Sequence, residues 1–211
     1  MGDPAERLLP FEITVCGLGD LDSYAALGVS HVLSILDPCL AERPSFAAFG
    51  AHRRLELCFD DILEPREGLV APQRVHVDGI LRFAGDLLVD PPRDAHLLVH
   101  CHMGISRSSA ALALILARVR PDLPAPQILG EVLRVRQRAW PNLRLIELGD
   151  AALDRQGELI AALAAVYRLQ LQRHPSSTGI SSSVAGNERW TMRFAAADKQ
   201  TIASASAHHR L

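Results

Sequence analysis

The sequence predicts an α/β fold: a mostly parallel central sheet of about four to five strands flanked by helices, followed by a helical C-terminal half. Short apolar runs of strand length alternate with segments of helical periodicity over the first part of the chain. Only helical patterns follow after about residue 120. Strands that alternate with helices favour parallel pairing, because each crossover helix returns the chain to the same end of the sheet.

Four segments have the patterns of strands. Residues 31–36 and 96–100 are almost continuously apolar, as buried parallel strands are, and the first of them ends at Asp37. Residues 55–59 alternate between apolar and polar side chains, which is typical of a strand with one buried face. Residues 11–15 form a shorter run of the same kind.

Helical periodicity connects and follows these strands. A short helix is predicted at about residues 20–27, and an amphipathic helix at 73–89, where apolar residues recur at helical spacing. A strongly apolar helix is predicted from about residue 105 to 119, directly after the fourth strand. The remaining predicted helices cover residues 126–137, 142–153 and 156–172.

The composition is that of a globular domain with an appended tail. Apolar residues make up 48% of the 211 residues, too many for a disordered chain, and the net charge of −2 argues against nucleic-acid binding. No apolar stretch has the roughly 18 residues of a membrane span, the first residues lack a signal-peptide pattern, and the four cysteines are scattered. We therefore expect a cytoplasmic protein without a membrane partner, with one domain at 1–173 and a flexible tail at 174–211.

The strongest functional signal is the segment HCHMGISRS, residues 100–108, between a predicted strand and a predicted helix. The five residues between Cys101 and Arg107 can wrap a tetrahedral anion with successive backbone N–H groups pointing inward. Gly104 supplies the backbone freedom that such a bend needs, and the guanidinium can form two parallel hydrogen bonds to phosphate oxygens. The expected anion-binding residues are His102, Met103, Gly104, Ile105, Ser106 and Arg107.

The same loop is expected to make Cys101 a nucleophile. A helix N-terminus and a neighbouring guanidinium both stabilise a thiolate, and a thiol that is already ionised needs no general base. Ser108 is placed to hydrogen-bond the thiolate or the departing sulfur. We interpret His100 as a residue that orients the loop through hydrogen bonds. A cysteine buried only for packing would leave Gly104, Arg107 and Ser108 without explanation.

The segment Val99 to Ser109 resembles the signature of the cysteine-dependent phosphatases, HCxxGxxR followed by Ser or Thr. Its Gly-Ile-Ser-Arg-Ser form is most similar to the dual-specificity, protein-tyrosine-phosphatase-like branch, and a looser similarity extends from Phe11 to Glu147. The resemblance implies a phosphatase-like catalytic domain and a phosphocysteine intermediate that water hydrolyses. We expect no cofactor, and a phosphorylated protein or a small phosphomonoester as the partner.

The resemblance also implies a general acid, an Asp on the loop after the strand that precedes the cysteine strand. Asp60 and Asp61 both lie there. Strict alternation from residues 57 and 59 favours Asp61, with Asp60 as the alternative. Asp61 precedes Cys101 by 40 positions (101 − 61), which is long for this branch, and we interpret residues 64–72 as a mobile insertion.

Other polar residues near these motifs leave alternatives open. His96 and His102 flank His100, but no second Cys or carboxylate accompanies these three, so we expect no metal site. Asn142 belongs to a Pro-Asn element that resembles one late in the family's domain, and it either holds the loop through its side chain or forms a plain turn. The arginines at 134, 136 and 138 either form a solvated helix face or recruit an anionic substrate.

Three functions compete. The leading one is a phosphoprotein phosphatase, active on phosphotyrosine and in the dual-specificity case also on phosphoserine or phosphothreonine. The second is a module that binds phosphate or a phosphoprotein without turnover. The third is a rhodanese-like sulfurtransferase, which also uses a loop cysteine at the start of a helix, but the His before Cys101 and the Ser-Arg-Ser after it fit this class less well.

Overall fold

The computed structural model describes residue 9, residues 11–89 and residues 95–174. Its internal contacts divide the chain into two units, Met1–Tyr167 and Arg168–Leu211. The elements described below belong to the first unit, except that the last helix, Glu158–Arg173, ends in the second. Residues 175–211, nearly all of the predicted tail, lie outside the described residues, so the predicted division at residue 173 stays a prediction. Within the described ranges, no helix is long and apolar enough to cross a membrane.

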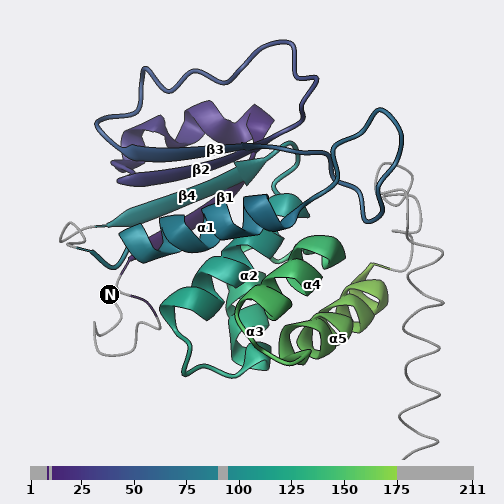
Figure 1. The fold of residues 1–211 in the computed structure, drawn as a ribbon. Helices are drawn as coiled ribbons and strands as arrows, with labels where there is room; N and C mark the ends of the chain where they lie inside the picture. The colour runs from purple at the N-terminus through teal and green to yellow at the C-terminus, as the bar shows by residue number, and fades with distance from the viewer. Residues whose placement is uncertain (1–8, 10, 90–94, 175–211) are drawn as a thin grey trace, which may run out of the picture. The chain divides into compact units, whose positions relative to one another are not determined.

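A four-stranded, all-parallel sheet in the order β1-β4-β2-β3 forms the centre of the first unit (Figure 1). Its strands are β1 (Glu12–Gly17), β2 (His31–Leu36), β3 (Arg53–Cys58) and β4 (His96–Cys101). The two central strands are the two most apolar runs, and every residue of β2 is buried. This pattern arises because both faces of a parallel sheet are covered. The predicted fold class is confirmed, with four strands.

Six helical segments follow or connect the strands in the described residues. They are η2 (Leu18–Leu27), α1 (Arg74–Asp86), α2 (Arg107–Val119), α3 (Ala125–Val135), α4 (Leu143–Ala152) and α5 (Glu158–Arg173). The predicted short helix is a 3₁₀ helix, η2, and it ends at Gly28, which adopts a left-handed conformation with φ +64°. The other helices lie within a few residues of their predicted bounds.

The helix after the cysteine strand begins two residues later than the sequence predicts, at Arg107 instead of Ile105. The carbonyl of Ile105 accepts hydrogen bonds from the backbone N–H of Trp140 (3.0 Å) and from the hydroxyl of Ser109. The first helical bond therefore runs from the N–H of Ala110 to the carbonyl of Ser106 (3.0 Å). Residues 102–106 are left free to form the bend that precedes the helix.

Helices α1 to α4 lie on one side of the sheet and η2 lies on the other (Figure 1). Every residue of α2 except Arg118 is buried, because α2 packs between the sheet and helices α1, α3 and α4. The opposite face is covered by a core cluster of Cys16, Leu21, Val29, Val32, Phe49 and Leu98. Both layers hold β4 rigidly in the middle of the sheet, and Cys101 is its last residue.

Candidate active site

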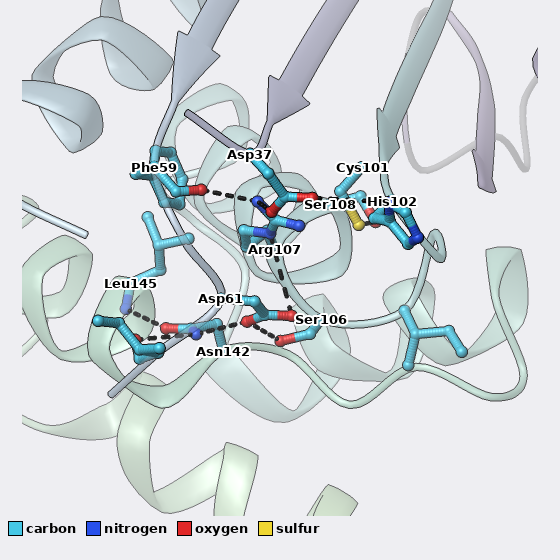
Figure 2. Close-up of polar contacts among 12 residues, drawn as sticks. Asp37, Phe59, Asp61, Cys101, His102, Ser106, Arg107, Ser108, Asn142 and Leu145 are labelled. Atoms are coloured by element: carbon cyan, nitrogen blue, oxygen red, sulfur yellow. Dashed lines mark hydrogen bonds and ion pairs between the residues drawn. The ribbon is translucent and has the colours of Figure 1, made fainter. Parts of the chain in front are cut away.

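The carboxyl ends of the four parallel strands meet at one edge of the sheet, where ligands bind in open α/β folds. The chain just past β2 carries Asp37, and the chain past β3 carries Phe59, Asp60 and Asp61. Strand β4 ends at Cys101 itself. The topology thus brings a thiol and three carboxylates, from segments far apart in the sequence, to a single edge. Figure 2 shows Cys101, Asp37 and Asp61 there.

The cysteine loop packs tightly against the end of β1. The N–H of Leu18 donates to the carbonyl of His102 (2.9 Å), and a Cβ on Gly17 would lie 3.2 Å from the same carbonyl oxygen. Gly104 has φ +66°, and a Cβ at this position would overlap the backbone carbonyl of Cys16. Both the backbone conformation and the space therefore require glycine at residue 104, as the loop motif predicts.

Arg136 holds the outer side of this loop. Its Nε donates to the carbonyl of Gly104 (3.0 Å) and its Nη2 to the carbonyl of Met103 (3.3 Å). Since the C=O and N–H of a trans peptide point in opposite directions, these bonds turn the N–H groups of Gly104 and Ile105 away from Arg136. Neither of the two interpretations from the sequence describes this residue, because its guanidinium binds loop carbonyls.

The thiol of Cys101 is buried and hydrogen-bonded. Its Sγ lies 3.2 Å from the Oγ of Ser108, in the first turn of α2, and both residues are at most 2% exposed. When the sulfur is a thiolate, the hydroxyl of Ser108 is the donor in this pair. The predicted neighbourhood of these two residues is thus present in the structure.

His100 lies one residue earlier on β4 and faces away from the loop. Its Nε2 lies 2.7 Å from the Oγ of Ser34, the residue opposite it in the register of β2 and β4. Burial, with a smaller contribution from the positive charge of Arg54, lowers the pKa of His100 to about 4. The imidazole is therefore neutral near pH 7. Among the described residues its hydrogen bond joins β4 to β2 and its buried Nδ1 makes none, so the predicted role in orienting the loop stays a prediction.

Asp61 is held between Ser106, the residue just before α2, and the N-terminus of α4. Its Oδ1 accepts hydrogen bonds from the Oγ of Ser106 (2.7 Å) and the Nδ2 of Asn142 (2.8 Å). Asn142 is also the N-cap of α4, because its Oδ1 accepts from the N–H of Leu145 (3.1 Å). Within the described part of the chain, the Oδ2 of Asp61 makes no hydrogen bond and lies 3.9 Å from the Nε of Arg107.

Asp60 is engaged elsewhere. Its N–H donates to the carbonyl of Val70 (2.7 Å), and its Oδ2 accepts from the N–H of the same residue (2.7 Å). This pair of bonds closes the base of the loop that carries Asp61. Of the two candidate acids, Asp61 lies beside the loop arginine, and Asp60 uses its carboxylate to fix the backbone.

The segment 64–72, interpreted from the sequence as a mobile insertion, is held at both of its ends. Arg144 in α4 donates from Nε to the carbonyl of Pro72 (2.7 Å) and from Nη1 to the carbonyl of Leu63 (3.3 Å). Asn142, two residues earlier, also contacts the carbonyl of Ile62 (3.4 Å). The N-terminal turn of α4 therefore anchors the whole loop after β3.

Arg107 is the most buried charged group of the site, at 2% exposed. Its Nη1 donates to the carbonyl of Phe59 (2.6 Å) and to the Oδ1 of Asp37 (2.7 Å), as Figure 2 shows. Its Nε is buried and makes no hydrogen bond within the described part of the chain. A buried donor without a partner is costly, so this edge of the guanidinium is suited to an anion.

The remaining predicted residues divide into two groups. His102 and Met103 are exposed at the rim of the loop, and the Nδ1 of His102 lies 3.5 Å from the Oδ2 of Asp37. His96 does not join them, because it lies at the other end of β4 and bonds the Oγ1 of Thr14 (2.8 Å). Among the described residues, no group of three His, Cys, Asp or Glu side chains could hold a metal.

Three contacts of the site were not predicted from the sequence. In the sequence, Asp37 is recognisable only as the residue that ends a predicted strand. A polar residue at the carboxyl end of a buried strand could still have indicated a ligand-binding residue. Arg136 stands out only by its spacing from two other arginines. Arg144 carries no signal, because its two acceptors are backbone carbonyls of a distant loop.

Comparisons with known proteins support the fold. No model of a known protein family matches the sequence, and no curated protein matches it either. Human DUSP28 matches in structure with a TM-score of 0.51 and 18% identity, over 71% of this chain and 98% of the other. The human tyrosine phosphatase-like serine/threonine/tyrosine-interacting protein matches with a TM-score of 0.52 and 18% identity, over 71% and 95%. The chain therefore has the fold of the dual-specificity phosphatases.

The lowered pKa of His100 has a consequence for stability. The unfolded chain takes up a proton near pH 6.5, while the folded chain resists it down to about pH 4, so stability falls as the pH drops through this window. One such group contributes a slope of at most about 1.4 kcal/mol per pH unit. We expect His100→Gln, which keeps a polar contact to Ser34 but does not titrate, to unfold with a shallower pH dependence between pH 4 and 6.5.

Urea unfolding of the wild type and of His100→Gln at several pH values measures this slope. Arg54→Ala is a second variant, at an exposed position. Removing this positive charge raises the pKa of His100 and therefore also makes the free energy of unfolding less dependent on pH. Equal slopes in all three proteins would show that His100 titrates normally.

Proposed function

We propose that this chain is a phosphoprotein phosphatase that acts on phosphotyrosine, and by dual specificity on phosphoserine and phosphothreonine, through a phosphocysteine intermediate. The observation that supports this most directly is the buried Arg107, whose Nε makes no hydrogen bond to any described residue and which belongs to the same loop as the thiol of Cys101. A cation buried with an open donor edge beside a nucleophile is suited to binding and attacking a phosphate group.

In the first step, the sulfur of Cys101 attacks phosphorus, the S–P bond forms and the P–O bond to the leaving group breaks. Arg107 and the N–H groups of the loop stabilise the equatorial oxygens as negative charge is redistributed. Asp61 donates a proton to the leaving oxygen, and Oδ2 is the atom to carry it because Oδ1 already accepts two hydrogen bonds. The product alcohol or phenol then leaves.

In the second step, water attacks the phosphorus and breaks the S–P bond. Asp61, now a carboxylate, takes a proton from this water. The hydroxyl of Ser108, 3.2 Å from the sulfur, donates to the thiolate as it departs. Inorganic phosphate is released and the enzyme returns to its starting state, so the cycle needs no cofactor.

A module that binds a phosphoprotein without turnover is the second candidate. The human phosphatase-like protein that shares the fold is named for interaction with serine, threonine and tyrosine, so the fold alone does not decide between binding and turnover. Turnover is favoured by two contacts at the loop. The thiol of Cys101 lies beside the hydroxyl of Ser108, and the carboxylate of Asp61 bonds Ser106. A sulfurtransferase would have no use for the acid that Ser106 and Asn142 hold beside Arg107.

Replacing the nucleophile tests turnover directly. We expect Cys101→Ser to lower the hydrolysis of para-nitrophenyl phosphate by at least about 10³-fold, because a serine hydroxyl is not ionised in this loop. The exposed Cys39 provides a matched control, since Cys39→Ser removes a thiol outside the site and should leave the rate unchanged.

The assay is run with reduced protein, with and without EDTA. Full activity in Cys101→Ser, or activity that EDTA removes, would contradict a cysteine mechanism. A well-folded wild type that binds tungstate but does not hydrolyse the ester would favour the binding module.

The contacts of the two aspartates predict different kinetic effects. We expect Asp61→Ala to lower kcat by about 10²-fold for an alkyl phosphate, and much less for an aryl phosphate with an acidic leaving group, which departs without a proton. Asp60→Ala should lower both rates by a similar factor, because it loosens the loop without removing a proton donor. Rates across a series of leaving groups measure this. If Asp60→Ala shows the steeper leaving-group dependence, Asp60 is the acid.

A further inference from the structure

We propose that Asp37 is a positioning residue that fixes the guanidinium of Arg107 with its open edge toward the bound oxyanion. The inference rests on the proposed function, since it assigns the phosphate to that edge. Asp37 follows β2 directly, and β2 pairs with β4, which ends in Cys101. The carboxylate therefore comes from the neighbouring strand of the sheet, a rigid position one strand away from the nucleophile.

The contacts of Arg107 assign different tasks to its two edges. Nη1 carries two protons, and its two acceptors are the carbonyl of Phe59 at 2.6 Å and the Oδ1 of Asp37 at 2.7 Å. Nη1 is thus fully used by the protein. Nε is buried and has no hydrogen-bond partner within the described residues. Nε and Nη2 form one edge, which is the edge that can bind two oxyanion oxygens side by side.

This division means that Asp37 does not occupy the oxyanion site. It binds the corner of the guanidinium that points away from the open edge, and together with Phe59 it fixes the plane of the group. A flexible arginine must lose rotamer freedom when it binds an anion, and an arginine that is already fixed loses less. We therefore expect the carboxylate to strengthen oxyanion binding despite its negative charge.

The other oxygen of Asp37 extends its reach to the cysteine loop. Oδ2 lies 3.5 Å from the Nδ1 of His102, the residue after the nucleophile. The side chain of Asp37 is 34% exposed, so it stands at the rim of the site, with Arg107 buried below it. Asp37 thus contacts both the arginine and the first residue of the loop, and its effect on the reaction passes through them.

The test measures oxyanion binding and turnover in the full chain. We expect Asp37→Ala to weaken the affinity of a Cys101→Ser background for tungstate, and to lower kcat/KM for para-nitrophenyl phosphate in the otherwise unchanged protein, each by roughly tenfold. Asp37→Asn should retain most of both, because its amide oxygen still accepts from Nη1. Asp22→Ala removes the same charge from an exposed position in η2 and should change neither.

A double-mutant cycle shows whether Asp37 acts through Arg107. In an Arg107→Lys background, Asp37→Ala should have no further effect on tungstate affinity, because the group that it positions is gone. An equal loss in both backgrounds would overturn the assignment. Tighter tungstate binding by Asp37→Ala would also overturn it, and would show that the carboxylate competes with the anion. Unchanged affinity and kcat/KM in a folded Asp37→Ala would show that the residue has no part in either.

The outcomes keep this inference separate from the proposed function. If the wild type binds tungstate but hydrolyses no ester, the phosphatase proposal fails and the binding measurements still decide the role of Asp37. If the wild type turns over and Asp37→Ala matches it in both measurements, the phosphatase proposal stands and Asp37 is not a positioning residue. A melting curve for each variant, with Asp37→Asn as the milder change, separates lost folding from lost binding.

Discussion

The burial of one positive charge is the constraint on which the site depends. Arg107 is 2% exposed at the start of α2, a helix whose residues are all buried except Arg118. A buried charge is tolerated only with well-placed acceptors, and Phe59 and Asp37 supply them for one corner of the guanidinium. The other edge faces the thiol loop and the carboxylate of Asp61. Among the described residues, the Nε on this edge makes no hydrogen bond, which suits a site that receives an anion.

The sheet order explains how these groups meet. Strand β4 lies between β1 and β2, so the loop that follows Cys101 has β1 on one side and the end of β2 on the other. The end of β1 presses on the loop at Gly104, and the chain after β2 provides Asp37. Helix α4 then fixes the loop after β3 through Asn142 and Arg144. The chemistry at this edge thus depends on packing from four strands and two helices.

The sequence predicts the elements that are locally encoded and misses those that depend on distant contacts. Apolar runs and helical spacing predict all four strands and the main helices. The loop motif predicts the backbone bend at Gly104 and the proximity of Cys101 to Ser108. The late start of α2 is missed because Trp140 takes the carbonyl that would begin the helix. The contacts of Asp37, Arg136 and Arg144 join segments tens of residues apart. Both arginines bind backbone carbonyls, and such acceptors produce no recognisable pattern in the sequence. The catalytic roles of the site residues stay predictions until activity is measured.

The most direct measurement is the mass of the Cys101 peptide after the protein is mixed with an aryl phosphate and quenched in acid. Asp61→Ala is the protein to use, because losing the base for water slows breakdown of the intermediate more than its formation from a good leaving group. A phosphocysteine mechanism predicts one phosphoryl group on Cys101, absent after mixing with Cys101→Ser. Turnover without phosphate on any cysteine, or with phosphate on another residue, would contradict it.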